Sequence, residues 1–140
     1  MDLPNSLIEL SIDRGAILHS SIFVNIDHPK FFVVIGVDED NIAGFFYINS
    51  RINENVIKAK TEQWRMQYLI NNKDYSFLDH DSYICASDIK IISRNSIVES
   101  VINGITKKVG NLKEDHLEDL LEMVRNSKLF SKIEKDKYFK

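Results

Sequence analysis

The polar side chains of this sequence that could do chemistry lie at the ends of two apolar runs. Asn49, Ser50 and Arg51 directly follow the second run, residues 42–48, and Lys30 directly precedes the first, residues 31–37. A lysine ammonium can supply a point charge to a phosphate. We therefore expect a site at this border of a buried sheet, although Asn and Ser are equally typical of turns that bond local backbone.

Two histidines add the possibility of acid–base chemistry. His28 follows Asp27, and His80 lies between Asp79 and Asp81. Histidine changes its charge near neutral pH, so it is the natural proton donor or acceptor in a catalytic site. A histidine exposed in a loop without a catalytic role is the more common case, and the sequence leaves both interpretations open.

Length and composition favour one soluble globular domain. With 140 residues, 44% hydrophobic and 28% charged, the chain is long enough to bury a core without disulfides or metals. The net charge of −3 argues against broad electrostatic affinity for nucleic acid, whose binders carry a basic excess. A local basic patch stays possible.

Cysteine content and hydropathy exclude several other classes. Cys85 is the only cysteine, so the chain cannot form an internal disulfide, and no Cys/His spacing resembles a zinc site. We expect no metal and no cofactor. The first residues lack the basic start and apolar core of a signal peptide, and no apolar run approaches the length of a membrane span. A cytoplasmic protein without a membrane partner is the expectation.

The elements that must position these residues are mostly strands. Residues 31–37 and 42–50 flank the polar connector 38–41, a pattern that predicts a β-hairpin whose first arm is covered on both faces. Gly36 and Gly44 predict bulges or a close backbone approach in the two arms. Further strands are expected in four segments, namely 16–24, 62–70, 82–86 and 89–92.

The apolar and aromatic side chains of these strands are expected in the core. Trp64, Met66, Tyr68 and Ile70 alternate with polar residues, as in a half-buried strand. Phe45, Tyr47, Trp64 and Tyr68 could stack on unpaired bases, but at strand spacing the core interpretation is favoured. Cys85 is expected to be a buried small hydrophobe.

The last third of the chain predicts helices, which makes the expected class mainly β with C-terminal helices (α+β). Ser96 and Glu99 have the spacing of a capping box, with Gly104 as a stop, and Asn111 with Glu114 repeats that spacing. The next helix has one apolar face, formed by Leu117, Leu120, Leu121 and Val124. Residues 130–140 are charged and are expected to fray.

Several short motifs, taken in order, resemble the PemK/MazF-like family of toxin–antitoxin toxins. The resemblance covers about residues 14–125 and depends on the order of the motifs more than on any one of them. In sequence order these are Gly15-Ala16-Ile17, Pro29 to Gly36, Ile48-Asn49-Ser50, Leu78 to Ile84 with Asp81-Ser82, and Val109-Gly110-Asn111-Leu112.

The resemblance implies a fold and partners. It implies a single domain over residues 1–140, folded as an SH3-like small β-barrel of about five to seven strands. Most members of the family are endoribonucleases that cut single-stranded RNA without a metal, and they are usually homodimers held in check by an antitoxin protein. The 2′-hydroxyl attacks the adjacent phosphorus, and a fixed cation stabilises the charge that develops.

The resemblance also assigns roles to the polar residues. Lys30, Ser50 and Arg51 take the catalytic positions, and His28, Asn49 and His80 are expected to bind substrate. The sequence departs from the family pattern because Pro29-Lys30 replaces Arg-Pro and Asn49-Ser50 replaces a Thr-Ser pair. Lysine lacks the bidentate fork of arginine. The alternative is therefore a non-catalytic module that binds a protein or nucleic acid through the same groove.

Overall fold

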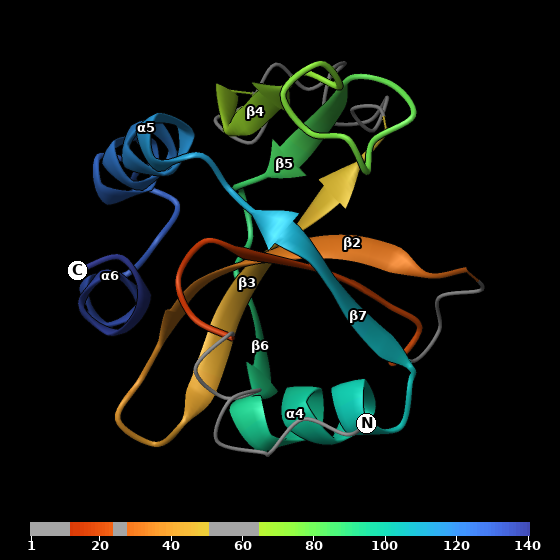
Figure 1. Ribbon diagram of the computed structural model, residues 1–140. Coiled ribbons are helices and arrows are strands. Elements are labelled where there is room, and N and C mark those ends of the chain that lie inside the picture. The colour runs from red at the N-terminus through yellow and green to blue at the C-terminus, as the bar shows by residue number, and fades with distance from the viewer. Residues whose placement is uncertain (1–11, 24–27, 51–64) are drawn as a thin grey trace.

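The computed structural model describes residues 12–23, 28–50 and 65–140, and within these ranges the chain is an α+β protein (Figure 1). In these ranges seven strands form one antiparallel sheet, and three described helices pack around it. The elements are β1 (Ala16–Ser20), β2 (Lys30–Val37), β3 (Ile42–Asn49), β4 (Gln67–Ile70), β5 (Ser82–Cys85), β6 (Lys90–Ser93), α4 (Arg94–Ile102), β7 (Thr106–Asn111), α5 (Glu114–Arg125) and α6 (Lys132–Tyr138).

The sheet has the order β4-β5-β3-β2-β1-β7, and β6 pairs with β3 outside this path. Strands β5 and β6 follow one another along the same edge of β3, at Ile48–Asn49 and at 42–45 respectively. The two end strands of the path, β4 and β7, do not pair with each other in the described part of the chain. The sheet is therefore not closed.

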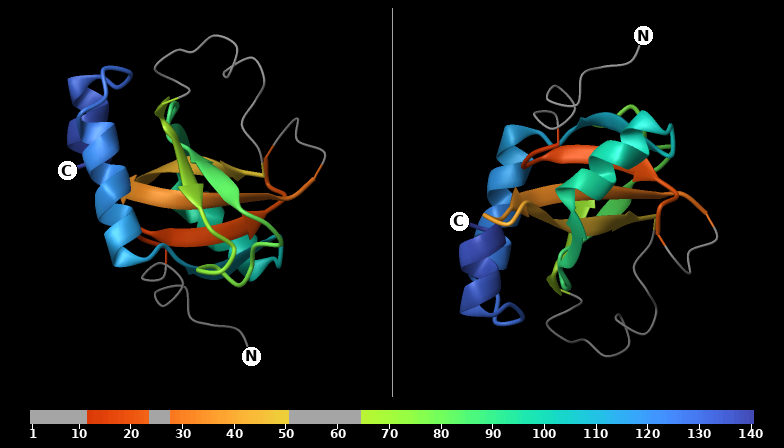
Figure 2. Two further views of the ribbon diagram at one scale, coloured as in Figure 1. Left: turned by 90° about the horizontal axis from the view of Figure 1, so that it is seen from above. Right: turned by 90° about the horizontal axis from the view of Figure 1, so that it is seen from below.

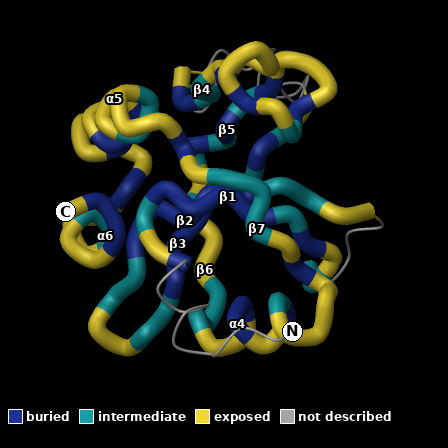
Figure 3. Tube along the Cα trace, in the orientation of Figure 1, coloured by how far each residue is buried: buried dark blue, intermediate teal, exposed yellow. Residues whose placement is uncertain are grey.

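The central hairpin is confirmed, and most residues of β2 and β3 are buried (Figure 3). Its two faces carry different cores. Side chains of β2 alternate between them, with Val33 and Ile35 in one cluster and Phe32 and Val34 in the other. Helices α5 and α6 cover the first cluster, and α4 covers the second. Seen from below, α4 lies across the strands, whereas α5 and α6 lie beside them (Figure 2). Because both faces of β2 are buried, almost every residue of this strand is apolar.

The close approach predicted at the two glycines is confirmed. Gly36 pairs with Gly44, and the register between β2 and β3 shifts next to this pair, between Val34 and Gly36. A Cβ on Gly36 would lie 2.5 Å from the carbonyl oxygen of Tyr138, and one on Gly44 would lie 2.7 Å from the Tyr138 ring. The two glycines therefore form the surface on which the end of α6 rests.

The prediction that residues 130–140 fray is wrong. Phe130, Tyr138 and Phe139 are buried, and a capping box of Ser131 and Glu134 starts α6. Two arginines hold the backbone at the end of this helix. Arg14 Nη2 donates to the Tyr138 carbonyl oxygen at 3.1 Å, and Arg125 Nε donates to the Phe139 carbonyl oxygen. The buried residues thus extend past the span 14–125 that resembles the family.

The phenol of Tyr138 makes the contact between α6 and the turn after β2 sensitive to high pH. Burial and a hydrogen bond donated to Asp38 Oδ2 at 3.1 Å raise the pKa of Tyr138 to about 12. Because the folded pKa exceeds the ordinary value of 10.0, the associated stability is complete below about pH 10 and is lost as the pH approaches 12. We expect Tyr138→Phe to lose less stability than the wild type between about pH 10 and 12 in urea unfolding. Equal losses in both proteins would contradict this assignment.

Several local boundaries differ from the sequence prediction. Strands are found at four predicted segments, over Ala16–Ser20, Gln67–Ile70, Ser82–Cys85 and Lys90–Ser93, while Trp64 lies outside the described residues. Both predicted helix starts are wrong, because Ser96 lies inside α4 and Asn111 is the last residue of β7. The chain turns at Gly104 as predicted, and the apolar face of α5 is confirmed.

Candidate functional site

The structure brings together two of the predicted site residues, Lys30 and Asn49. Lys30 begins β2 and Asn49 ends β3, and the register Phe31↔Ile48, continued by one residue, places them opposite each other. The Lys30 ammonium donates a hydrogen bond to Asn49 Oδ1. Both side chains are half-buried, so the pair forms the polar end of the sheet face that α4 covers further along.

The ring of Tyr47 contacts the same ammonium. Lys30 Nζ lies over its ring, 5.1 Å from the centroid, in the geometry of a cation–π contact. The ring in turn packs edge-on against Phe23 and Phe45, with centroids 5.2 and 5.6 Å apart. Tyr47 therefore belongs to the edge of the core, and its ring positions Lys30 instead of offering both faces to a base.

The electrostatics of Lys30 are those of a cation with little counter-charge. Burial lowers its pKa, and the nearby Cys85 thiol opposes this change. Its contacts in the described residues are the neutral amide of Asn49 and the ring of Tyr47, without a carboxylate. A partly desolvated charge is costly unless it is paired. An anion placed at this end of the sheet would supply the missing pair.

Cys85 borders this cluster and is not the fully buried residue that we expected. It is half-buried at the end of β5, where its Sγ accepts a hydrogen bond from Gln67 Nε2 at 3.5 Å and lies 3.4 Å from Ser87 Oγ. Antiparallel pairing with Gln67 of β4 places it there. The thiol is thus one of several polar groups around Lys30.

The other predicted residues lie at the same end of the sheet without touching Lys30 in the described part of the chain. His28 precedes β2, Ser50 follows β3 and His80 precedes β5; antiparallel pairing brings these three strand ends together. All three residues are exposed. The carbonyl oxygen of His80 accepts a hydrogen bond from Ser82 Oγ. Arg51 lies outside the described residues.

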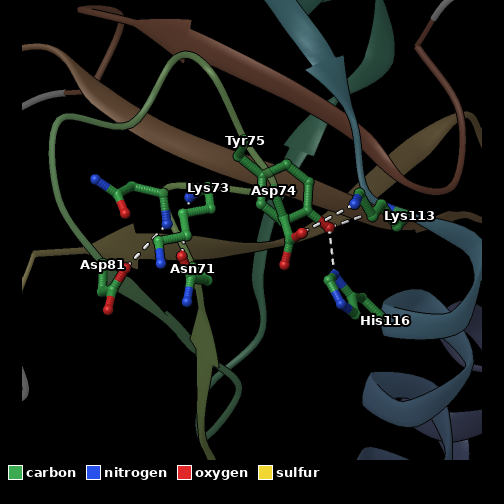
Figure 4. A network of polar contacts seen from close by, with 8 residues as sticks. Asn71, Lys73, Asp74, Tyr75, Asp81, Lys113 and His116 are labelled. Carbon is green, nitrogen blue, oxygen red and sulfur yellow. Dashed lines mark hydrogen bonds and ion pairs between the residues drawn. The ribbon is translucent and has the colours of Figure 1, made fainter.

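A second polar cluster, which the sequence did not suggest, connects the loop after β4 to α5 (Figure 4). The buried Tyr75 hydroxyl accepts a hydrogen bond from the Lys113 backbone N–H at 3.0 Å and lies 2.6 Å from His116 Nδ1. The hydroxyl therefore connects the residue before α5 to a histidine of its first turn. Lys113 Nζ also pairs with Asp74 at 3.0 Å. These contacts join the loop after β4 to the start of α5 and thereby help to hold the helix in place.

Two absences concern the described residues alone. Among them, no three His, Cys, Asp or Glu side chains are grouped so as to hold a metal ion. No helix among the described elements has the length and apolar character needed to cross a membrane.

Neither a protein-family model nor a curated protein sequence matches the chain.

Proposed function

We propose that this chain is a divergent relative of the PemK/MazF-like toxins and that the Lys30 end of its sheet binds single-stranded RNA. Its open sheet would then correspond to the SH3-like barrel of that family. The order of motifs along residues 14–125 supports the relationship. One observation carries the proposed function: the half-buried Lys30 ammonium contacts a neutral amide and an aromatic ring, and no carboxylate, within the described residues.

A phosphate fits this environment because it replaces the counter-charge that the protein does not supply. Asn49 fixes the ammonium from one side and Tyr47 from below, so the cation keeps its position before a ligand arrives. A fixed cation is also what cleavage requires, since negative charge grows on the phosphate oxygens as the new bond forms. In the proposed reaction the RNA 2′-oxygen attacks phosphorus, the bond to the 5′-oxygen breaks, and a cyclic phosphate and a 5′-hydroxyl result.

The proton transfers of this reaction would fall to residues at the same end of the sheet. Ser50, His28 and His80 are exposed there, and Arg51 follows Ser50 in the chain. A histidine could take the proton of the 2′-hydroxyl near neutral pH. We propose catalytic roles for Lys30, Ser50 and Arg51, with both histidines and Asn49 binding the substrate.

A second candidate function is a non-catalytic module that binds RNA or a protein at the same place. The contacts of Lys30 favour it, because in the described residues they include neither a carboxylate nor a histidine. Binding needs only the cation, whereas cleavage also needs a base within reach. Cleavage in the absence of metal separates the two candidates.

The decisive experiment measures binding and cleavage of a mixed single-stranded RNA pool in EDTA. We expect Lys30→Ala to weaken binding about 10- to 100-fold, as for loss of one charge-assisted hydrogen bond, and Lys113→Ala, which removes the same charge elsewhere, to bind like the wild type. Cyclic-phosphate ends that disappear in the Ser50→Ala and Arg51→Ala proteins would support the ribonuclease. Binding without cleavage would support the module, and a folded wild type that binds no RNA would contradict both.

The partner proposals rest on the same resemblance. We propose that two copies of the chain associate and that a protein of the antitoxin kind binds them. The end strands β4 and β7 suit such contacts, because each is paired on one edge only in the described part of the chain. Sedimentation of the purified protein tests self-association.

A further inference from the structure

A second cation, Lys90, lies on the same sheet face as the Lys30 site. Lys90 begins β6 and pairs across the sheet with Phe45, two residues before Tyr47 on β3. Residues two apart on a strand point to the same face. The face that carries Tyr47 and Asn49 therefore also carries Lys90.

The two lysines share an environment. Both interact electrostatically with the thiol of Cys85, and Lys90 interacts with Tyr47, the residue on whose ring Lys30 rests. Lys90 is the more exposed of the two, with 45% of its side chain accessible. A mobile, hydrated lysine can reach a phosphate beside one that a fixed lysine already holds.

Lys90 differs from Lys30 in having an acidic neighbour. Asp88 lies in the turn between β5 and β6, and its Oδ2 forms an ion pair with Lys90 Nζ at 2.7 Å. The Asp88 side chain is 64% exposed. Exposed ion pairs of this kind contribute little to stability, so a phosphate can replace the carboxylate at small cost. The Asp88 carboxylate therefore competes with a phosphate for the Lys90 ammonium.

We propose that Lys90 is a second phosphate-binding residue of the Lys30 site, that the site holds two successive phosphates of one RNA strand, and that Asp88 competes with the second phosphate. This inference rests on the proposed function, because it concerns how RNA binds at the same site. It adds two roles that the sequence did not suggest. The preferred ligand is a strand with at least two phosphates in a row, and the Asp88 carboxylate limits its affinity.

The chain offers a matched control for both residues. Lys113 and Asp74 form a second exposed ion pair, with an Nζ–Oδ1 distance of 3.0 Å and side chains 49% and 39% exposed. This pair belongs to the cluster that holds α5, and none of the contacts described above connects it to Lys30. Lys113→Ala and Asp74→Asn therefore change the net charge as Lys90→Ala and Asp88→Asn do, at a place where no RNA is expected.

The test is the affinity for a fluorescent oligouridylate, measured by anisotropy over a series of salt concentrations. Each phosphate contact on a single strand contributes about 0.7 to the slope of log affinity against log salt. We expect Lys90→Ala to weaken binding and to reduce that slope by about 0.7. Asp88→Asn should strengthen binding about two- to five-fold, and the two control variants should bind like the wild type.

The outcomes separate this inference from the proposed function. If Lys30→Ala loses binding while Lys90→Ala matches Lys113→Ala, the second phosphate site is wrong and the proposed function stands. If Asp88→Asn matches Asp74→Asn, or binds more weakly than the wild type, the competing role of Asp88 is wrong. If the wild type binds no oligouridylate and no mixed RNA, both proposals fail together.

Discussion

Replacing Phe139 with alanine is expected to lower the free energy of unfolding by about 3–5 kcal/mol, as for other fully buried phenylalanines. Phe139 has no exposed surface and packs against Phe46 and Phe130, with ring centroids 6.0 and 4.9 Å away. Its backbone is held as well, because its carbonyl oxygen accepts a hydrogen bond from Arg125. The segment therefore cannot easily collapse into the cavity that the missing ring leaves.

Urea unfolding of the purified variant measures this effect, and Ile133→Ala is its control. Ile133 lies in the neighbouring helix α6, but 67% of it is exposed. An exposed substitution of this kind changes stability by about 0.5 kcal/mol or less. A Phe139→Ala protein with the midpoint of the Ile133→Ala protein would show that the chain after α6 does not belong to the core.

Gly36→Ala is expected to destabilise the protein by about 1–3 kcal/mol or more, because it overpacks the contact between β2 and α6. The new Cβ would lie 2.5 Å from the Tyr138 carbonyl oxygen. That oxygen is fixed by Arg14, whose Nε also donates to the Ile35 carbonyl oxygen at 2.7 Å. Moving the backbone of Tyr138 away from the methyl group would break the hydrogen bond to Arg14.

The same substitution at another strand glycine is the matched control. A Cβ on Gly110, in β7, would find its nearest contact at 3.8 Å from the Phe77 ring, an ordinary van der Waals distance. We expect Gly110→Ala to be neutral or slightly stabilising, since alanine reduces the entropy of the unfolded chain. Equal unfolding midpoints for the two variants would contradict the close approach of α6 to Gly36.

The parts of the fold that could be predicted are those in which local pattern and tertiary burial agree. The run 31–37 is apolar at every position except Gly36, and the structure buries alternate side chains of β2 in two different clusters. Helix α5 was predictable for the same reason. Its apolar positions recur at helical spacing, and they are the positions that face the core.

The errors arose where tertiary contacts override a local signal. Ser96 has the spacing of an N-cap, but β6 leads directly into α4, and the Arg94 N–H donates to the Asn41 carbonyl oxygen instead of to a side-chain cap. Asn111 pairs with Ala16 across β7, so it cannot cap a helix. Strand β7 itself was missed, because its sequence Thr-Lys-Lys-Val-Gly-Asn has a charged centre and a glycine.

Of the predicted site residues, Lys30 and Asn49 are the two that the structure joins, and their contacts could not be predicted from the sequence. Lys30 and Asn49 stood out because polar residues end apolar runs, yet their hydrogen bond follows from the register of β2 on β3. The support from Tyr47 and the position of Lys90 depend on which strand faces coincide. The sequence alone does not show which strands pair, so it cannot show which side chains share a face of the sheet.

The packing of α6 on the β2–β3 hairpin also affects how the chain folds. Tyr138 bonds Asp38 across 100 residues, and Arg14 bonds Tyr138 across 124. The hairpin is local and can form early, but the core cluster that holds Phe46 is complete only after Phe130, Tyr138 and Phe139 have been synthesised. Contacts between such distant residues slow folding, and an apolar face left uncovered promotes aggregation. A nascent chain of this protein should therefore depend on chaperones until α6 is made.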